Sequence, residues 1–558
     1  EAGSYDSLRD WVGDQPFSLF FETVGPQAGM FDEPQKRAFV AVEREVRSTS
    51  EDDALRLFQT TPGQAILHDA KPLFKRVPAC LDCIRFDSML AGYVLQSGRS
   101  AYALRDLVQG YLEVTPPATG AEMAAAVWML EPVMRDRLEK EGQTRVLDEI
   151  ELPLVPVLAE MERNGVAVSR DFLGEFSKSL EGEIERLAHS VFEQAGQEFN
   201  IGSPKQLGEV LFEKLQIPGP KKTKTGYATG AEVLQLLSPT HQICGDVLSW
   251  RELTKLKSTY ADALPRMIGP DGRIHTTYNQ TGAATGRLSS NEPNLQNIPI
   301  RTELGRKIRR AFVAEDGYRL ASFDYSQIEL RVLAHLVKDE ALIDAFANHE
   351  DVHTVTAALM YGVPNSEVTK EQRRYSKMLN YAVSYGVTDF GLANQLGGGF
   401  SVSEARALIE QYFSRFPRIK EYMDGVVAEA RSKGFTTTLY GRRRHFPDIH
   451  NANRNERMGA ERQAMNAPIQ GTAADMMKLA MLRVRGLLGS SETRMLLSVH
   501  DEILLELRDG DYALIEPIRE SMAHALELDV PIDVDAKIGV NWDEMTPVEA
   551  PVPASAAT

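Results

Sequence analysis

The sequence predicts a multidomain protein in which an α/β domain precedes a larger α+β region. Its 558 residues are more than one hydrophobic core usually supports, which indicates three or four domains. Residues 1 to about 145 alternate short apolar runs with helical stretches, a pattern typical of an α/β domain. From about residue 273, two strand-like segments enclose a long helical insertion. This spacing predicts a sheet built from strands that lie far apart in the chain.

The elements follow in a clear order. From residue 150 to about 257 the pattern is one of long amphipathic helices, interrupted by the basic loop "GPKKTKTGYATG". The two strand-like segments are "YRLASFDYS" and "TRMLLSVHDEILLEL", and the helical insertion between them covers about 335 to 485. The tail "TPVEAPVPASAAT" is rich in proline and alanine, so we expect it to be disordered. No apolar run is long enough to cross a membrane and no signal peptide opens the chain, so we expect no membrane association.

Composition and charge narrow the function classes. A hydrophobic content of 43% with 25% charged residues is typical of globular proteins. The net charge of −17 argues against a nucleic-acid coat protein, which would be basic throughout. It leaves room for an enzyme that concentrates its cations, and these do cluster in "GRKIRRAF", "KKTKTGY" and "YGRRRHF".

Three cysteines favour a reducing compartment. Cys80 and Cys83 form a C-x-x-C, but the third cysteine, Cys244, has no Cys or His partner nearby to complete a zinc site. A structural role is therefore the simpler interpretation.

One segment carries an unusual stripe. In "RRYSKMLNYAVSYG", Arg373, Lys377, Tyr381 and Tyr385 recur every four residues, so on a helix they share one face. Such a stripe is usually a solvated edge beside a core stripe.

Two acids stand at the ends of the predicted strands. Asp324 ends the first strand, and Asp501 lies in a tight turn with His500 and Glu502. A carboxylate beside a buried strand is costly unless it is paired or binds a metal. On neighbouring strands the two acids would form the core of a two-metal phosphoryl-transfer site, in which the cations lie ~3.5 to 4 Å apart.

The motifs "DYSQIELR", "RRYSKMLNYAVSYG" and "VHDE", in this order, resemble the three polymerase motifs of family A DNA polymerases. The similarity is to the large-fragment part of the bacterial members and extends from about residue 150 to "GVNW" near Trp542. It includes "SPKQLGEVLFEKL", "TGRLSSNEPNLQNIPIR" and "ERQAMNAPIQGTAADMMKLAM". The resemblance implies an RNase H-like 3′–5′ exonuclease-type α/β domain followed by a right-hand polymerase, with an antiparallel palm sheet and a helical thumb and fingers.

The resemblance also implies roles at the catalytic centre. Asp324, Asp501, Arg373 and Lys377 would be catalytic, and Asp324, Asp501 and the Tyr325 backbone carbonyl would bind two Mg²⁺ ions, for which Mn²⁺ can substitute. The dNTP-binding residues would be Arg373, Lys377, Tyr381, Tyr385, Gln327, Glu329 and His500. Glu329 corresponds to the steric gate that excludes a 2′-hydroxyl. Tyr381 stands where phenylalanine is common, which predicts ready incorporation of dideoxynucleotides. Whether His500 and Glu502 act directly or only shape the turn stays open.

A second implied group would hold primer–template DNA. Its members are polar or basic, and minor-groove acceptors presented by all base pairs suit donors that check pair shape without reading sequence. They are Arg287, Asn294, Gln296, Asn297, Arg462, Asn466 and Gln470, with Lys221, Lys222 and Lys224 gripping duplex phosphates from the thumb.

The implied domains are a degenerate exonuclease-like domain at 1–148, a thumb with the start of the palm at 149–272, palm at 273–334, fingers at 335–465, palm at 466–545, and a disordered tail at 546–558.

The partners would be primer–template DNA and dNTPs. We expect a monomer in the bacterial cytoplasm, associated with the nucleoid. The 5′-nuclease domain usual in the full-length family members is absent from this sequence, as expected if an N-terminal portion is missing.

The N-terminal domain departs from its proofreading relatives. In "FSLFFETVG", Glu22 matches the second acid of the expected D-x-E, but Phe20 replaces the first. Near the second motif Asp69 falls out of register and Leu73 takes the expected place, while "TGAEMAAAVWML" offers neither tyrosine nor aspartate. Because one carboxylate cannot hold two cations, we expect an exonuclease fold without 3′–5′ proofreading.

Three alternatives remain at this stage: a proofreading polymerase whose exonuclease motifs are misaligned, a catalytically dead DNA-binding scaffold, and a single-subunit RNA polymerase. The paired acids and the cations at 373 and 377 count against the scaffold. Glu329 counts against the RNA polymerase.

Overall fold

The computed structural model describes residues 4–24, 35–77, 83–220, 222, 224, 226–300, 302–397 and 400–549. Lys221 and Cys80 lie outside the described residues, as does the tail from residue 550. Within the described part of the chain, no helix is both long and apolar enough to span a bilayer.

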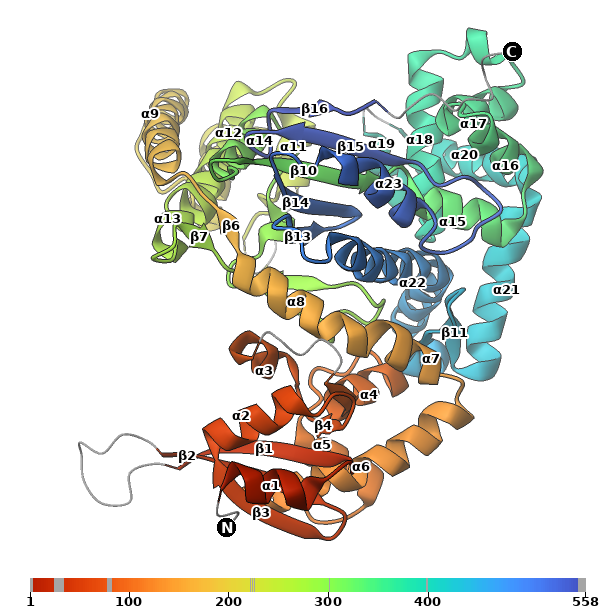
Figure 1. Cartoon of the computed structure of the whole chain (residues 1–558). Coiled ribbons are helices and arrows are strands. Elements are labelled where there is room, and N and C mark those ends of the chain that lie inside the picture. The colour runs from red at the N-terminus through yellow and green to blue at the C-terminus, as the bar shows by residue number, and fades with distance from the viewer. Residues whose placement is uncertain are drawn as a thin grey trace.

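The N-terminal domain is a five-stranded sheet covered by helices, at the bottom of Figure 1. The strand order is β3-β2-β1-β4-β5, with the first three strands antiparallel and β4 and β5 parallel to β1. The strands are β1 (Phe17–Val24), β2 (Gln35–Val42), β3 (Glu45–Ser50), β4 (Ala65–Leu67) and β5 (Ile84–Asp87). Helix α6 (Gly120–Lys140) packs on β1, where the Ser18 hydroxyl donates to the Ala124 carbonyl at 2.6 Å. The other helices are α1 (Tyr5–Val12), α2 (Glu51–Thr60), α3 (Lys71–Arg76), α4 (Ser88–Leu95), α5 (Leu104–Leu107) and α7 (Thr144–Val146).

A second five-stranded sheet, antiparallel throughout, forms the centre of the molecule. Its order is β13-β14-β10-β15-β16, from β10 (Tyr318–Tyr325), β13 (Arg494–Val499), β14 (Glu502–Arg508), β15 (Val534–Gly539) and β16 (Met545–Pro547). The two predicted strand segments therefore pair, as β10 with β14, across the intervening insertion. Alternation along β10 buries Ala321 and Phe323 on one face of the sheet and leaves Asp324 on the other face, where it borders a cavity.

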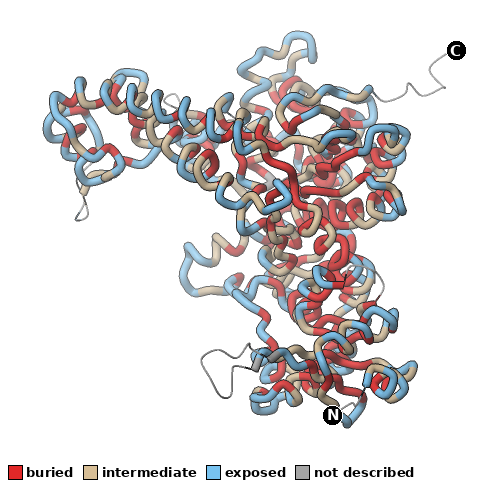
Figure 2. The backbone as a smooth tube through the Cα atoms, turned by 60° about the vertical axis from the view of Figure 1, so that its left-hand side comes forward, coloured by how far each residue is buried: buried red, intermediate tan, exposed pale blue. Residues whose placement is uncertain are grey.

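A helical arm projects from one side of this sheet (Figures 1 and 2). Its long helices are α9 (Arg170–Ala195) and α12 (Gln242–Leu256), with α10 (Pro204–Gly208) and α11 (Ala231–Leu237) at the tip and α13 (Leu264–Met267) at the base. The tip has its own small core around Leu207, Leu211 and Val247, and most of the outer surface in Figure 2 is exposed.

The helical insertion lies on the opposite side of the sheet. It consists of α15 (Ile328–Val337), α16 (Glu340–Ala347), α17 (Val352–Tyr361), α18 (Lys370–Ser384), α19 (Asp389–Leu396), α20 (Val402–Arg415) and α21 (Pro417–Lys433), followed by a hairpin of β11 (Phe435–Thr437) and β12 (Arg443–His445). The chain then returns beneath the sheet through α22 (Arg454–Leu488).

Two details correct the expected boundaries. The division between residues 465 and 466 falls inside α22, which is one continuous helix of 35 residues. The segment expected to be a disordered tail from 546 begins with ordered residues, because β16 pairs with β15 through Thr546 and Pro547.

Helix α8 (Leu152–Asn164) lies between the N-terminal domain and the central sheet. Its Glu162 carboxylate is buried, accepts a hydrogen bond from the Tyr278 amide at 2.8 Å and pairs with Lys71 of α3 at 2.6 Å. The Tyr278 hydroxyl in turn accepts from the Ser498 amide at 2.9 Å. The two domains are thus joined by buried polar contacts that reach the strand leading to Asp501.

Candidate active site

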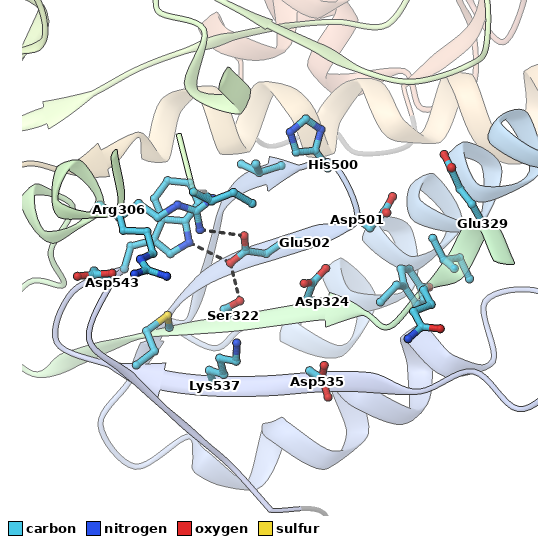
Figure 3. A pocket seen from close by; sticks show the side chains of 18 of the residues that line it. Arg306, Ser322, Asp324, Glu329, His500, Asp501, Glu502, Asp535, Lys537 and Asp543 are labelled. Carbon is cyan, nitrogen blue, oxygen red and sulfur yellow. Dashed lines mark hydrogen bonds and ion pairs between the residues drawn. The ribbon is translucent and has the colours of Figure 1, made fainter. Parts of the chain in front are cut away.

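The largest concentration of predicted site residues lines a cavity of about 500 Å³ over the central sheet (Figure 3). Asp324, Gln327, Glu329, Tyr381, His500 and Asp501 all reach it, although they come from three stretches of the chain that are far apart in sequence. Tyr325 also lines the cavity.

The two predicted catalytic acids meet at one edge of the sheet. Asp324 is the penultimate residue of β10, and Asp501 lies in the two-residue turn between β13 and β14. The Tyr325 amide donates to the Asp501 carbonyl at 3.1 Å, which holds the turn against the end of β10. His500 adopts a left-handed backbone conformation with φ of 54°, which reverses the chain in so short a turn. Figure 3 shows both carboxylates directed into the same space.

The sheet register creates a strongly acidic row. Asp324 pairs directly with Glu502 on β14 and with Asp535 on β15, so three carboxylates share one face of three adjacent strands. Burial raises the pKa of Asp324 to about 7, and the neighbouring carboxylates of Glu502, Asp501 and Asp535 add to this effect. Burial also raises the pKa of Asp501, although Arg287 opposes this. Both acids therefore resist ionisation in the free protein, and a bound cation would relieve that cost.

Glu502 is held by its neighbours within the protein. Its carboxylate accepts from the Ser322 hydroxyl at 2.5 Å and from the Trp542 indole at 2.9 Å, and it faces Arg309 at 3.5 Å. These contacts, drawn as dashed lines in Figure 3, turn it away from the two aspartates. The geometry therefore favours a supporting role for Glu502.

Glu329 occupies the opposite end of the cavity in a three-residue network. Its two oxygens accept from Arg287 Nη2 at 2.5 Å and from the Tyr385 hydroxyl at 2.9 Å. Burial and the adjacent Glu329 raise the pKa of Tyr385 to about 12, so the phenol remains a donor. This network fixes the carboxylate in one orientation at the cavity wall.

Gln327 begins α15 with φ of 53° and lines the same cavity. Its Oε1 atom is buried, and the structure gives it no hydrogen-bond partner. A buried acceptor without a donor is uncommon in folded proteins.

The stripe on α18 faces outward, as the functional interpretation requires. Arg373, Lys377 and Tyr385 are exposed, whereas Leu379 and Val383 on the opposite face are buried. Tyr381 is half-buried, lines the cavity and packs beside the His353 ring with centroids 5.7 Å apart.

Arg373 and Lys377 lie outside the cavity lining. The Arg373 guanidinium forms two hydrogen bonds with Asp351, of 2.6 and 3.1 Å, and this pairing lowers the Asp351 pKa against the opposing effect of burial. The sequence motif could not predict that Arg373 pairs with Asp351, because Asp351 caps the start of another helix, α17.

The residues expected to contact DNA fall into four groups, three around the central sheet and α22 and one, the lysines, on the helical arm. Arg287 and Gln296 line a small cavity beside His500 and Asp501, and Gln296 also donates to the Ser498 carbonyl at 3.1 Å. Asn294 and Asn297 are exposed and line a pocket between α12 of the helical arm and the 293–299 segment. The third group, on α22, is less uniform.

Arg462 packs beside Gly386 at the end of the α18 stripe, where a Cβ would meet its Cγ at 3.1 Å. Gln470 is partly exposed, but Asn466 is buried, with an Oδ1 atom that lacks a hydrogen-bond partner. On the arm, Lys222 pairs with Glu213 at 2.6 Å and Lys224 is exposed.

Two of the basic clusters are not the free cationic surfaces that the sequence suggested. In "GRKIRRAF", Arg309 contacts Glu502 and stacks over Trp542, and Arg310 pairs with Asp543 at 2.8 Å. In "YGRRRHF", Arg442 is buried between Glu151 and Asp475. These guanidinium groups support the site from within.

The positions that carry the exonuclease acids in proofreading relatives can be located in the N-terminal domain. Glu22 is on β1 near the start of α6, where a Cβ at Gly120 would meet its Oε2 atom at 3.0 Å. Leu73 is buried in α3. Asp87 is also buried, but its carboxylate caps α4 through the Met89 and Leu90 amides and accepts from the Ala70 amide at 2.7 Å.

Several residues that line the cavity escaped the sequence reasoning, and two of them flank the acids. Asp535 and Lys537 lie on β15 next to Asp324 and Ser322. The alternation in "PIDVDAKIG" could have revealed the strand, since Val534, Ala536 and Ile538 alternate with polar residues.

The donor set suits hard cations. Magnesium is usually held by one or two protein carboxylates together with substrate phosphates, rather than by a complete cage of side chains. Asp324 and Asp501 supply two carboxylates, and no group of three or more His, Cys, Asp or Glu side chains among the described residues could hold a metal by itself. This arrangement fits cations that arrive with a phosphorylated ligand.

Comparison with known proteins gives a consistent result. Residues 170–544 match the model of DNA polymerase family A. DNA polymerase I of Pseudomonas aeruginosa is 45% identical over 514 residues, covering 86% of this chain and 56% of the relative. DNA polymerase I of Geobacillus stearothermophilus is 48% identical over 424 residues, covering 75% of this chain and 48% of the relative. The chain thus spans about half the length of these curated relatives.

A solved structure is similar over almost its whole length. The POL domain of Pol1 from M. smegmatis, in complex with DNA primer-template and dNTP, superposes with a TM-score of 0.89 at 38% identity. The match covers 98% of this chain and 99% of that one.

Proposed function

The chain belongs to DNA polymerase family A, and from this premise we propose that it extends a primer 3′-OH with dNTPs on a DNA template, releasing pyrophosphate. The observation that carries the proposal is the meeting of Asp324 and Asp501 in one cavity that the outward face of α18 borders through Tyr381. Primer extension tests it directly, with dNTPs and then rNTPs.

Asp324 and Asp501, with the Tyr325 carbonyl, would hold two Mg²⁺ ions, and Mn²⁺ would substitute. Bound there, the ions would lower the pKa of the primer hydroxyl and neutralise the leaving pyrophosphate. The raised pKa of Asp324 supports this assignment, because the surroundings leave its charge uncompensated.

The chain's own residues orient the nucleotide. Tyr381 would lie against its sugar and base, and Glu329, fixed by Arg287 and Tyr385, would stand where a 2′-hydroxyl would project. Arg373 and Lys377 would meet the triphosphate after α18 moves towards the sheet. Gln327 and His500 would complete the pocket from below.

Duplex DNA would lie along the pocket between α12 of the arm and the 293–299 segment. Asn294 and Asn297 are exposed there, and Arg287 and Gln296 reach the same region from beside the acids. Arg462 and Gln470 would contact the template side, while Lys221, Lys222 and Lys224 would grip phosphates more distant from the catalytic centre. Asn466 is buried, so it would support the neighbouring α22 side chains.

The N-terminal domain would be an exonuclease-type domain without 3′–5′ activity. Its mixed five-stranded sheet, covered by helices, supports this assignment. Phe20 stands at the position where the first acid is expected. The carboxylate of the buried Asp87 already accepts hydrogen bonds from backbone amides, among them those of Ala70 and Met89. A 3′-mismatched primer incubated with Mg²⁺ but no dNTPs should remain intact. Shortening of that primer would instead establish a proofreading enzyme.

A matched set of variants separates catalysis from binding. Asp324→Ala and Asp501→Ala should abolish extension while keeping primer–template affinity within about threefold, since neither acid grips the duplex. A variant that still extended at the wild-type rate would remove that residue from the metal site. Light scattering of the purified chain tests the expected monomer.

A further inference from the structure

The loop formed by residues 280–287 ends in Arg287, whose side chain reaches Glu329. Its backbone is unusual at Gly286, which has φ of +90° and abuts Arg442. A Cβ at this glycine would meet Arg442 Nε at 3.0 Å. The position of Arg287 therefore depends on the groups packed against this loop.

The N-terminal domain supplies the first of these groups. Tyr93, on α4, is fully buried, and its hydroxyl donates to the Ala283 carbonyl at 2.6 Å. The same carbonyl accepts the Gly286 amide at 3.3 Å. Three residues after α4 ends at Leu95 the domains approach again, since a Cβ at Gly98 would lie 3.6 Å from the Ala284 Cβ.

Arg442 supports the other side of the loop and is itself fixed by buried charges. It faces Asp475 at 2.7 Å and Glu151 at 2.6 Å, and Lys478 also reaches Glu151 at 2.7 Å. All four side chains are at most 3% exposed.

Gln143, near the end of the N-terminal domain, holds the turn that carries Arg442. Its amide nitrogen donates to the Gly441 carbonyl at 2.6 Å, and its amide oxygen accepts from the Arg443 amide at 3.1 Å. In Figure 1, β11 accordingly lies beside α7.

We propose that the N-terminal domain is a positioning element for the polymerase centre: through Tyr93 and Gln143 it sets the loop that places Arg287 against Glu329 and the primer terminus. The proposal rests on the proposed polymerase function and extends it, because it gives a domain without excision chemistry a part in nucleotide addition. Tyr93 is thus a positioning residue, which acts through Arg287 and touches no substrate.

The physical basis is the hydrogen bond at Ala283. Tyr93→Phe removes only the hydroxyl, so the ring still fills its site while the carbonyl loses its best donor. Loss of this hydrogen bond lets the loop relax and Arg287 move with it. The rate of nucleotide addition should then fall about three- to tenfold. Nucleotide affinity should change less than the maximal rate, because the cations expected to bind the triphosphate, Arg373 and Lys377, lie on α18 and not on this loop.

The experiment is single-nucleotide addition to a matched primer–template at increasing dNTP concentration. The variants are Tyr93→Phe, Tyr102→Phe, Arg287→Ala and the double variant Tyr93→Phe with Arg287→Ala. Tyr102 is the matched control: its buried ring packs edge-on against Tyr93 at 5.8 Å, but its hydroxyl donates within its own domain, to the Gln96 carbonyl. Thermal unfolding verifies that each variant is folded, and Gln143→Leu serves as a second route to the same loop.

The expected result is a slower maximal rate for Tyr93→Phe and Gln143→Leu, an unchanged rate for Tyr102→Phe, and no further loss when Tyr93→Phe is added to Arg287→Ala. Wild-type rates in folded Tyr93→Phe and Gln143→Leu would overturn the proposal. An equal loss from Tyr93→Phe with and without Arg287 would overturn it as well, since the effect would not pass through that arginine. Failure of the wild-type chain to extend any primer would instead reject the proposed function.

Discussion

The buried charge cluster beneath the active site can be tested by a single substitution, Lys478→Met. Lys478 is 1% exposed and its Nζ atom lies 2.7 Å from Glu151 Oε1. Burial by itself would raise the pKa of Glu151, but Lys478 and Arg442 together lower it. The carboxylate is therefore charged and depends on its two cations.

The magnitude follows from the charge balance. Glu151 and Asp475 are balanced by Arg442 and Lys478, so the cluster is neutral, and Lys478→Met leaves one negative charge uncompensated. Breaking a buried pair in this way costs about 3 to 5 kcal/mol. Because Arg442 stays within 2.6 Å of Glu151, we expect the lower end, about 3 kcal/mol.

Urea unfolding near neutral pH measures the effect, with Lys140→Met as the control. Lys140 forms a pair of nearly the same length, 2.6 Å to Asp136, but its side chain is 73% exposed. That substitution should cost less than about 1 kcal/mol. Adding Glu151→Gln to Lys478→Met restores neutrality and should recover part of the loss. Equal losses for the two lysine variants, or strictly additive losses in the double variant, would refute the reasoning.

Three further predictions concern the site itself. Tyr381→Phe should lose roughly tenfold or more in dideoxynucleotide incorporation, because the phenol no longer replaces the missing 3′-hydroxyl hydrogen bond; equal use of ddNTPs by both proteins in primer extension would contradict this. Glu329→Ala should admit rNTPs while slowing dNTP addition, and competition between dNTP and rNTP on one template measures the change. His353 is 2% exposed, and burial lowers its pKa to about 4, with Asp351 opposing. In the unfolded chain this histidine takes up a proton near its ordinary pKa of 6.5. The free energy of unfolding should therefore be unaffected above pH 6.5 and fall by up to about 3 kcal/mol as the pH drops to about 4. In His353→Gln, urea unfolding should show a weaker dependence on pH over this range.

The sequence was most informative where local periodicity and burial agree. The strands around Asp324 and Asp501 are short apolar runs that end on an acid, and they pair in the central sheet as expected. The α18 stripe was equally clear, because a four-residue repeat assigns polar and aromatic groups to one face and leaves Leu379 and Val383 for the core.

The sequence was least informative about the partners of charged groups. Arg309 and Arg442 stand in runs that look like solvated cationic surfaces, yet each faces an acid more than 30 residues away in the chain. Pairing of this kind depends on which strands and helices become neighbours, and no local pattern encodes it. The same limit explains why Asp351 was not recognised as the partner of Arg373.

The positions of the cations on α18 bear on how a nucleotide would be held. Tyr381 reaches the cavity, whereas Lys377 and Arg373 lie one and two steps of four residues towards the helix start, about 6 and 12 Å along the axis. Phosphates that met both the acids and these cations would have to bridge that distance, so α18 would have to approach the sheet. Such a movement separates Arg373 from Asp351, whose side chains are 46% and 34% exposed. A pair so open to solvent contributes no more than about 1 kcal/mol, so a triphosphate offering several anionic oxygens would displace Asp351 with ease. The contact would therefore orient Arg373 before binding without opposing its proposed transfer to a triphosphate.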